Sequence, residues 1–440
     1  MSFPTYPAYK DSGVEWLGDV PSDWLLKRFK QVFSERGERS LDGSEELMSV
    51  SAYFGVKPRA ETLDEGDHLS RAESLEGYKI CRVNDLVMNI MLAWNRGLGF
   101  AWQDGIVSPA YSVFHVIDGS IPKYLDYLVR SDEMTRYFKA YSAGVIDSRL
   151  RLYPETFGRL YVAIPSSAEQ TQIARFLDHE TARIDALIEE QQRLIELLKE
   201  KRQAVISHAV TKGLDPTVPM KDSGVEWLGE VPAHWKVSKL GHYAQILTGF
   251  PFPSASFSHD ESDVRLLRGA NIGVGSLKWI DTVYWELNEG DELSSYLMTE
   301  GQIVLGMDRP WISEGMRIAR VTQDDMPCLL LQRVAAITPN AGLNDEYLYC
   351  LLASELFKAY VEPDLTGVSV PHISPEQILS FQIPVPHIDE QRKISRFIKD
   401  QLDQMSALFE QASESVELLQ ERRSALISAA VTGKIDVRNW

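Results

Sequence analysis

The chain is poor in the residues that build redox and metal centres. Its 440 residues include only three cysteines, Cys81, Cys328 and Cys350, with no Cys-x-x-Cys pair and no histidine cluster beside them. Neither a disulfide framework nor a metal site is therefore expected. The N-terminus lacks a basic start followed by an apolar segment, and nowhere do eighteen apolar residues run together. The sequence thus predicts a soluble, cytoplasmic protein with no membrane contact.

Motifs of common nucleic-acid enzymes are missing as well. The chain contains no Asn-Pro-Pro or Asp-Pro-Pro of amino-methyltransferases, and its single Gly-Lys pair, Gly433-Lys434, is followed by Ile435 and makes no phosphate loop. No Asp or Glu stands two positions before a lysine, as in many restriction nucleases. No nucleophile is paired with a base. We therefore expect no catalytic residues and no cofactor bound by this chain.

Basic residues are outnumbered by acidic ones. Lys and Arg number 45 against 63 Asp and Glu, a formal net charge of -18, which argues against a protein that coats nucleic acid unaided. Most of the excess lies in residues 214–386, which carry a net charge of -12. If DNA is bound, local basic patches or the surface of a partner must supply the electrostatic attraction.

Two sequence repeats divide the chain into halves. Nine residues at positions 10–18, Lys-Asp-Ser-Gly-Val-Glu-Trp-Leu-Gly, recur at 221–229, and each copy runs into Val-Pro-x-x-Trp. A second repeat, Glu-Gln-x-x-Ile-x-Arg-Phe, begins at Glu169 and again at Glu390. The repeated segments form a frame, and the unlike segments between them are two inserts. This pattern is expected if the frame binds one partner twice and each insert binds a different target. The alternative is a recent tandem duplication with neutral drift.

The second repeat opens two segments with helical periodicity. Neither residues 169–207 nor residues 390–431 contain proline or glycine, and apolar residues recur at steps of three and four. At ~1.5 Å per residue each helix is roughly 55–60 Å long. Such a helix needs a partner, and an antiparallel pair of the two copies gives a pseudo-twofold molecule. The alternative is that each helix packs only on its own domain. Positions expected in the helix pair or a subunit interface are Ile184, Leu187, Leu194, Leu198, Met405, Leu408 and Leu419.

The inserts show one pattern of strands and helices. The first insert has short strand-like runs at 85–90 and 111–116, and the second has similar runs at 301–306, 316–321 and 334–337. Each insert then has an amphipathic helix, with apolar residues in equivalent places 223 positions apart, such as Tyr124 and Tyr347. The prediction is an internally duplicated α+β fold. Its expected segments are 1–165, 166–213, 214–386 and 387–440.

Basic and aromatic residues gather in the predicted loops of both inserts. Arg, Lys and Asn side chains make base-edge and phosphate contacts to duplex DNA. The alternatives are a solvated arginine or lysine and a tryptophan in the core. Trp16 and Trp227 of the first repeat either anchor a partner or clamp that repeat onto its own domain. The candidate DNA-binding residues are Lys57, Arg59, Arg71, Trp94, Asn95, Arg96, Arg149 and Arg151 in the first insert and Arg265, Arg268, Asn271, Arg309, Trp311, Arg317 and His372 in the second.

Taken together, the motifs resemble those of the specificity (S) subunits of Type I restriction-modification systems. The likeness covers nearly the whole chain. It includes Asp-Ser-Gly-Val-Glu-Trp-Leu-Gly-x-Val-Pro-x-x-Trp twice, Ile164-Pro165 and Val385-Pro386 before each Glu-Gln repeat, and Gly-Ile-Val-Ser-Pro-Ala-Tyr at 105–111.

The resemblance implies a non-catalytic subunit that recognises double-stranded DNA. In that family each insert is a target recognition domain that reads half of a bipartite sequence. The paired helices space the two domains and bind two methyltransferase (M) subunits, which bring S-adenosylmethionine and methylate adenine N6. Restriction (R) subunits with an ATP- and Mg-dependent motor join some of these complexes. The rival interpretation, which the acidic charge favours, is a duplicated coiled-coil scaffold that binds proteins rather than DNA.

Overall fold

The protein forms two compact units. The first contains residues 1–192 and 413–440, and the second contains residues 193–412. Two helices, α5 (Ser167–Lys212) and α9 (Ile388–Val431), contribute residues to both units. Across the described ranges, no helix combines the length and the apolar character that a membrane span requires. The computed structural model describes residues 3–62, 74–146, 149–288, 290–313, 315–365 and 371–440.

In the described residues, the first unit is built from short strands and four short helices, besides its parts of α5 and α9. Its helices are α1 (Phe29–Val32), α2 (Pro122–Val129), α3 (Asp132–Ala140) and α4 (Pro154–Arg159). Its strands are β1 (Tyr9–Asp11), β2 (Asp19–Pro21), β3 (Leu25–Arg28), β4 (Phe33–Glu35), β5 (Met48–Ser51), β6 (Gly55–Pro58), β7 (Lys79–Cys81), β8 (Leu86–Asn89), β9 (Leu98–Phe100), β10 (Gly105–Val107), β11 (Tyr111–Val116) and β12 (Tyr161–Ile164).

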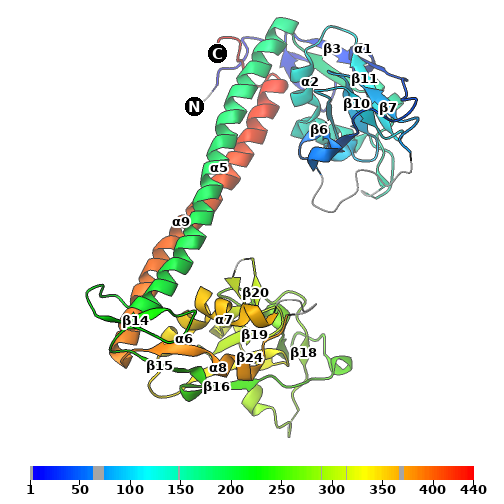
Figure 1. The fold of residues 1–440 in the computed structure, drawn as a ribbon. Helices are drawn as coiled ribbons and strands as arrows, with labels where there is room; N and C mark the ends of the chain where they lie inside the picture. Colours follow the sequence, from blue (N-terminus) through cyan, green and yellow to red (C-terminus); the bar gives the residue numbers. More distant parts are fainter. Residues whose placement is uncertain (1–2, 63–73, 147–148, 289, 314, 366–370) are drawn as a thin grey trace. The chain divides into compact units, whose positions relative to one another are not determined.

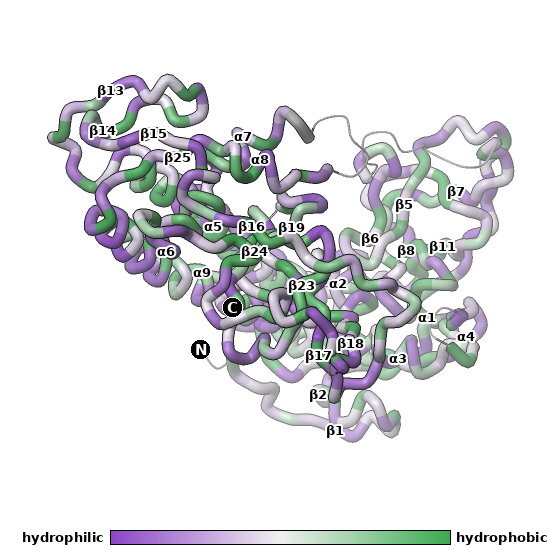
Figure 2. Tube along the Cα trace, turned by 90° about the horizontal axis from the view of Figure 1, so that it is seen from below, coloured by the Kyte–Doolittle hydropathy of each residue, from purple (hydrophilic) through white to green (hydrophobic). Residues whose placement is uncertain are grey.

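An antiparallel sheet in the order β4-β11-β8-β9 lies at the centre of this unit. All four residues of β8 are buried, and the hydrophobic character of the central strands is visible in Figure 2. The strands β5 and β6 form a separate hairpin, and β3 pairs with β12 where the insert begins and ends. The predicted amphipathic helix is two helices, because Ser131 caps α3 by accepting a hydrogen bond from the Met134 amide.

The second unit repeats this plan. A four-stranded antiparallel sheet has the order β16-β24-β19-β22, and β15 pairs with β25 as β3 does with β12. A three-stranded sheet, β18-β17-β23, has no equivalent in the described part of the first unit. The elements are β13 (Met220–Asp222), β14 (Glu230–Pro232), β15 (Lys236–Lys239), β16 (Ala244–Thr248), β17 (Val264–Leu267), β18 (Tyr284–Trp285), β19 (Ile303–Gly306), β20 (Trp311–Ile312), β21 (Gly315–Met316), β22 (Ile318–Arg320), β23 (Cys328–Leu330), β24 (Val334–Pro339), β25 (Gln382–Val385), α6 (Asp345–Leu352), α7 (Glu355–Leu365) and α8 (Pro375–Ser380).

The two long helices are antiparallel. In the first unit the beginning of α5 lies beside the end of α9 (Figure 1). Ile184 there shares a core with Leu426. In the second unit the end of α5 lies beside the beginning of α9, and Ile206 shares a core with Ile394. Each unit's core therefore contains both helices. The interpretation in which each helix packs only on its own domain is wrong.

A repeated set of contacts fixes the helices to the units. The indole Nε1 of buried Trp24 donates to Glu169 Oε1 at 3.0 Å, and Trp235 donates to Glu390 Oε1 at the same distance. The Tyr124 hydroxyl of α2 donates to the Val431 carbonyl near the end of α9. Its counterpart, the Tyr347 hydroxyl, donates to Val210 O near the end of α5. The duplication is thus preserved at the level of single hydrogen bonds, and the predicted duplicated α+β fold is confirmed.

The tryptophans of the first repeat pack within their own units. Trp16 stacks on Tyr137 with ring centroids 3.8 Å apart, and Trp227 packs on Tyr360 at 4.9 Å. Both are partly buried against the core. Of the two interpretations, the structure favours the clamp onto the protein's own domain.

Candidate nucleic-acid interface

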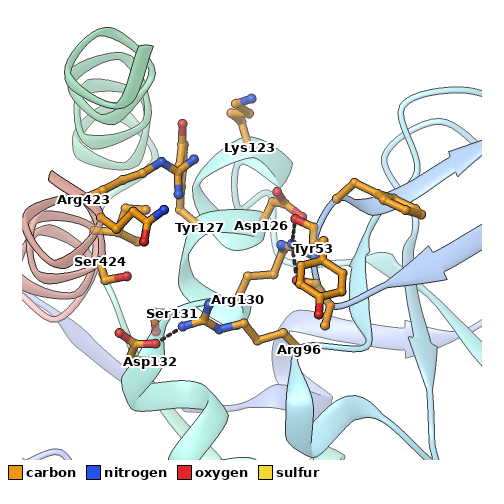
Figure 3. A pocket seen from close by; sticks show the side chains of 14 residues that line it. Tyr53, Arg96, Lys123, Asp126, Tyr127, Arg130, Ser131, Asp132, Arg423 and Ser424 are labelled. Atoms are coloured by element: carbon orange, nitrogen blue, oxygen red, sulfur yellow. Dashed lines mark hydrogen bonds and ion pairs between the residues drawn. The ribbon is translucent and has the colours of Figure 1, made fainter. Parts of the chain in front are cut away.

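A cleft of about 720 Å³ opens in the first unit between the tip of the β5–β6 hairpin, α2 and the last turns of α9 (Figure 3). Cationic side chains from the β8–β9 loop, from α2 with its C-cap and from α9 converge on it: Arg96, Lys123, Arg130 and Arg423. Two of these pair across neighbouring elements, Lys123 with Asp178 at 3.2 Å and Arg423 with Asp185 at 2.7 Å. The cleft is therefore a polar surface open to solvent, with its cations held in place by carboxylates.

Arg130 has a different role from the other cations. Its guanidinium donates to main-chain carbonyls of the β5–β6 turn and to Leu98 O at 2.8 Å. Burial lowers the pKa of this guanidinium and raises the pKa of the neighbouring Asp126 carboxyl, which accepts from the Phe100 amide at 2.9 Å. These two side chains tie the hairpin to β9 and α2.

Arg96 lies in the loop between β8 and β9 with a backbone φ of 59°, a conformation that non-glycine residues seldom adopt. Its guanidinium pairs with Asp132 in the first turn of α3, as drawn in Figure 3. Next to it, the Trp94 ring lies under the Lys139 ammonium at 5.3 Å. An unfavourable backbone conformation that is held by side-chain contacts is a feature of binding loops. This loop presents the Arg96 guanidinium to the cleft.

The second unit has an equivalent loop after β19. Arg309 is exposed there, with φ of 43°, and Lys358 of α7 lies 4.4 Å from the centroid of the Trp311 ring. The arrangement of Arg96, Trp94 and a helix lysine is thus repeated with different neighbours. A second cleft, of about 620 Å³, is lined by Trp311 and by Arg202 of α5.

The predicted site residues of the first insert divide into three groups. Lys57, Asn95 and Arg149 are exposed, and Arg96 lines the cleft. Arg59, Trp94 and Arg151 are partly buried, with Trp94 Nε1 donating to Met91 O and Arg151 donating to Leu150 O. Arg71 lies outside the described residues.

In the second insert several of the predicted DNA-binding side chains bond the backbone of their own unit. Asn271 is fully buried, and its side chain bonds the Arg268 amide and the Lys278 carbonyl, so its prediction as a DNA contact is wrong. Arg317 donates to the carbonyls of Gly269, Ile272 and Asp308.

Two further arginines of this insert are also held by its own backbone. Arg268 donates to Asp281 O, and Arg265 donates to Asp324 O while lying 5.0 Å from the Trp279 ring. Exposed Arg309 and partly buried Trp311 and His372 remain at the surface, with His372 Nδ1 2.6 Å from Asp308. The basic surface of the second insert is therefore smaller than its sequence suggests.

The seven helix positions also differ in burial. Ile184, Leu198 and Met405 are buried, and Leu419 packs partly buried on the first core. Leu187, Leu194 and Leu408 are 44%, 38% and 49% exposed, so the helix pair does not bury them. Their place at a subunit interface stays a prediction.

The β5–β6 hairpin and the residues that support it were not predicted from the sequence. Its flanks, Leu-Met-Ser-Val and Val-Lys-Pro-Arg, contain few strand-forming residues besides valine, so the sequence carries little hairpin signal beyond Gly55 in the turn. Within the described ranges, no group of three or more His, Cys, Asp and Glu side chains is arranged to hold a metal ion. The surface that the structure does form is one of loops, cations and aromatic rings.

The sequence is similar to known proteins of one kind. Residues 232–418 match the family described as "Type I restriction modification DNA specificity domain". The MjaVIII specificity subunit of Methanocaldococcus jannaschii is 26% identical over 431 residues, 96% of this chain and 95% of that protein. The EcoAI specificity subunit of Escherichia coli is 31% identical over 205 residues, which cover 46% of this chain and 34% of that protein.

Solved structures share the fold. A chain described under "Structural basis underlying complex assembly and conformational transition of the type I R-M system" gives a TM-score of 0.69 at 17% identity, covering 94% of this chain and 98% of that one. The HsdS subunit of Thermoanaerobacter tengcongensis gives 0.52 with the same identity and coverage. With a duplicated frame, a matching DNA specificity domain at residues 232–418 and 26% identity to a specificity subunit over 96% of its length, the chain is similar to the specificity subunits of type I restriction-modification systems and shares the fold of a solved one.

Proposed function

We propose that this chain is a specificity subunit that reads a bipartite target in double-stranded DNA, one half with each insert. The observation that carries the proposal is the contrast between frame and inserts. The Trp24–Glu169 contact recurs as Trp235–Glu390 with the same 3.0 Å distance, whereas the loops after β8 and β19 differ in sequence and structure. A constant frame with two different loop surfaces fits one scaffold that presents two readers.

The repeated frame further supports two copies of one partner, which we take to be the methyltransferase subunit. Leu187 and Leu408 occupy equivalent positions of the two helices and are both about half exposed, and so are Leu197 and Leu418, at 51% and 58%. Exposed leucines kept in both copies suit a protein contact that is made twice. The partner would bring S-adenosylmethionine for adenine N6 methylation, and restriction subunits would add ATP- and Mg-dependent cleavage.

The DNA contacts are proposed to come from exposed loop cations. Lys57 and Arg149 of the first insert and Arg309 of the second are exposed cations of the predicted set, and Arg96 lines the cleft. The net charge of -18 predicts that the isolated chain binds DNA weakly and in a salt-sensitive way. The partner's surface is then needed to complete the attraction.

Mapping of methylated adenines tests the proposal directly. A strain without other adenine methylation, which carries this chain with its methyltransferase partner, should acquire methylation at one bipartite sequence. The chain alone with S-adenosylmethionine should methylate nothing, because it has no methyltransferase motif. Methylation without sequence preference in the complete complex would contradict the proposal, and so would methyl transfer by the pure chain.

Replacement of Arg96 by alanine should relax one base position. If the guanidinium leaves Asp132 and grips a guanine edge, the variant loses about 1–3 kcal/mol of binding to the correct site and discriminates less at that position. Binding of the complex to duplexes with single base-pair changes measures this. The control is Arg82→Ala, which removes an exposed arginine paired with Glu38. An equal loss on every sequence, with a shallower salt dependence, would assign Arg96 to a phosphate instead.

A further inference from the structure

The tip of the β5–β6 hairpin presents an aromatic side chain to solvent. Tyr53 is 94% exposed, while its backbone amide is held by the Ser51 hydroxyl at 3.1 Å. A ring in this position buries almost no apolar surface, so it adds little to folding. Folding alone therefore does not account for a tyrosine at the apex.

The tip is fixed from below by Arg130. Its Nη1 donates to Ser51 O at 3.4 Å and its Nη2 to Ala52 O at 3.2 Å and to Tyr53 O at 3.1 Å. Nη1 also donates to Leu98 O at 2.8 Å. Desolvation of a guanidinium is unfavourable unless its donors are satisfied. Here the donors are satisfied by the backbone of the hairpin, so the cation acts as a rigid support for the turn.

Two glycines make room for this support. A Cβ atom on Gly55, which has a φ of 78°, would lie 2.9 Å from Arg130 Nη1, and one on Gly99 would lie 3.1 Å from Gly55 Cα. Side chains at these positions would therefore push the guanidinium and the hairpin apart. The hairpin, the arginine and the two glycines form one rigid platform for Tyr53.

The surroundings of the platform suit an anionic partner with flat apolar groups. Tyr53 and Phe54 line the same cleft as Arg96, Lys123 and Arg423, and Figure 3 shows Tyr53 on the side opposite α9. Lys57 lies 5.8 Å from the centroid of the Phe54 ring. Duplex DNA offers both features, because its phosphates meet the cations and its bases stack on aromatic side chains.

We propose that Tyr53 is a specificity-determining residue that stacks on a base at a distorted step of the half-target read by the first unit, with Arg130 as its positioning residue. The inference rests on the proposed DNA-reading function. Tyr53 would contribute a stacking contact with a base where the DNA is deformed, a kind of contact that the loop arginines do not provide. Pre-organisation by Arg130 lowers the entropy that the tip loses on binding.

Substitution of Tyr53 tests the stacking contact in the complete complex of the chain with its methyltransferase subunit. Tyr53→Ala should weaken binding to the cognate duplex on the order of 10- to 100-fold, while Tyr53→Phe, which keeps the ring, should stay within roughly threefold of the parent. A 2-aminopurine placed at the contacted step should be quenched by the parent and by Tyr53→Phe only. The control Leu41→Ala removes another side chain that is 90% exposed and does not line the cleft.

The outcomes separate the inference from the proposed function. Unchanged binding by Tyr53→Ala overturns the inference, and equal weakening on cognate and unrelated duplexes overturns the base contact. Loss of assembly with the methyltransferase subunit would instead make Tyr53 a protein contact and also overturn it. A parent complex that fails to prefer any sequence would refute the proposed function itself.

Arg130 is tested by a change that loosens the tip without removing the ring. Arg130→Lys, with three donors on one atom, cannot span the four carbonyls and should relax discrimination at the Tyr53 step. Gly55→Ala, which places a methyl group against the Arg130 guanidinium, should also relax discrimination at the Tyr53 step. Circular dichroism establishes that each variant is folded. Full discrimination by both folded variants would overturn the positioning role, and if neither folds, Tyr53→Ala and Tyr53→Phe decide the inference.

Discussion

Replacement of residues 25–163 by the first insert of another specificity subunit should change one half of the methylated sequence and leave the other half intact. The junctions are favourable because Leu25 of β3 pairs with Ile164 of β12, so the insert leaves and re-enters the frame at one point. Methylome sequencing of cells that carry the chimera and the methyltransferase subunit gives the result as a motif. The effect is qualitative, since one half-site is exchanged for another.

The reciprocal exchange is the matched control. Residues 236–384 are bounded in the same way, with Lys236 of β15 paired to Val385 of β25. Their replacement should change the other half-site. The donor inserts must keep a tyrosine at the positions of Tyr124 and Tyr347, because these hydroxyls bond the ends of α9 and α5. If either exchange altered both half-sites in a folded complex, the inserts would not be independent readers.

The frame was largely predictable because repeats and helical periodicity are local signals. Positions 169–207 and 390–431 lack helix breakers, and the observed helices Ser167–Lys212 and Ile388–Val431 extend the predicted ones by a few residues. Equivalent apolar residues also predicted that both inserts share one fold. The Trp24–Glu169 contact was not predicted, because its partners are 145 residues apart and neither belongs to a motif with known chemistry.

Individual DNA contacts were less predictable, since an arginine in a loop has two uses that look alike in sequence. Arg317 and Arg268 donate to backbone carbonyls of the second unit, whereas Arg309, in the same insert, is exposed. Whether a guanidinium meets a carbonyl or solvent depends on how distant loops fold back. The same reason explains the failure at Asn271, which is buried by contacts with Arg268 and Lys278.

Burial along α5 predicts very different effects for two neighbouring positions. Ile184 is 4% exposed in the core that contains Leu426, so Ile184→Asp places a carboxylate among apolar side chains and should lower the free energy of unfolding of the first unit by at least about 3 kcal/mol. Leu187 is 44% exposed, and Leu187→Asp should change that free energy by about 1 kcal/mol or less. Hydrogen exchange in α2 and β11 reports on the first unit alone, which avoids a two-state analysis of the whole chain.

The same pair of variants separates the helix pair from the proposed partner surface. Leu187→Asp, although folded, should copurify with less methyltransferase subunit than the parent, and so should Leu408→Asp because it occupies the equivalent position of α9. With one position changed, the subunit on the other copy should still bind, so the complex should retain one methyltransferase by native mass spectrometry. With both changed, none should remain. Full copurification of the folded double variant would exclude these leucines as the docking surface, while loss of fold in Leu187→Asp comparable to Ile184→Asp would mean that Leu187 supports the helix pair after all.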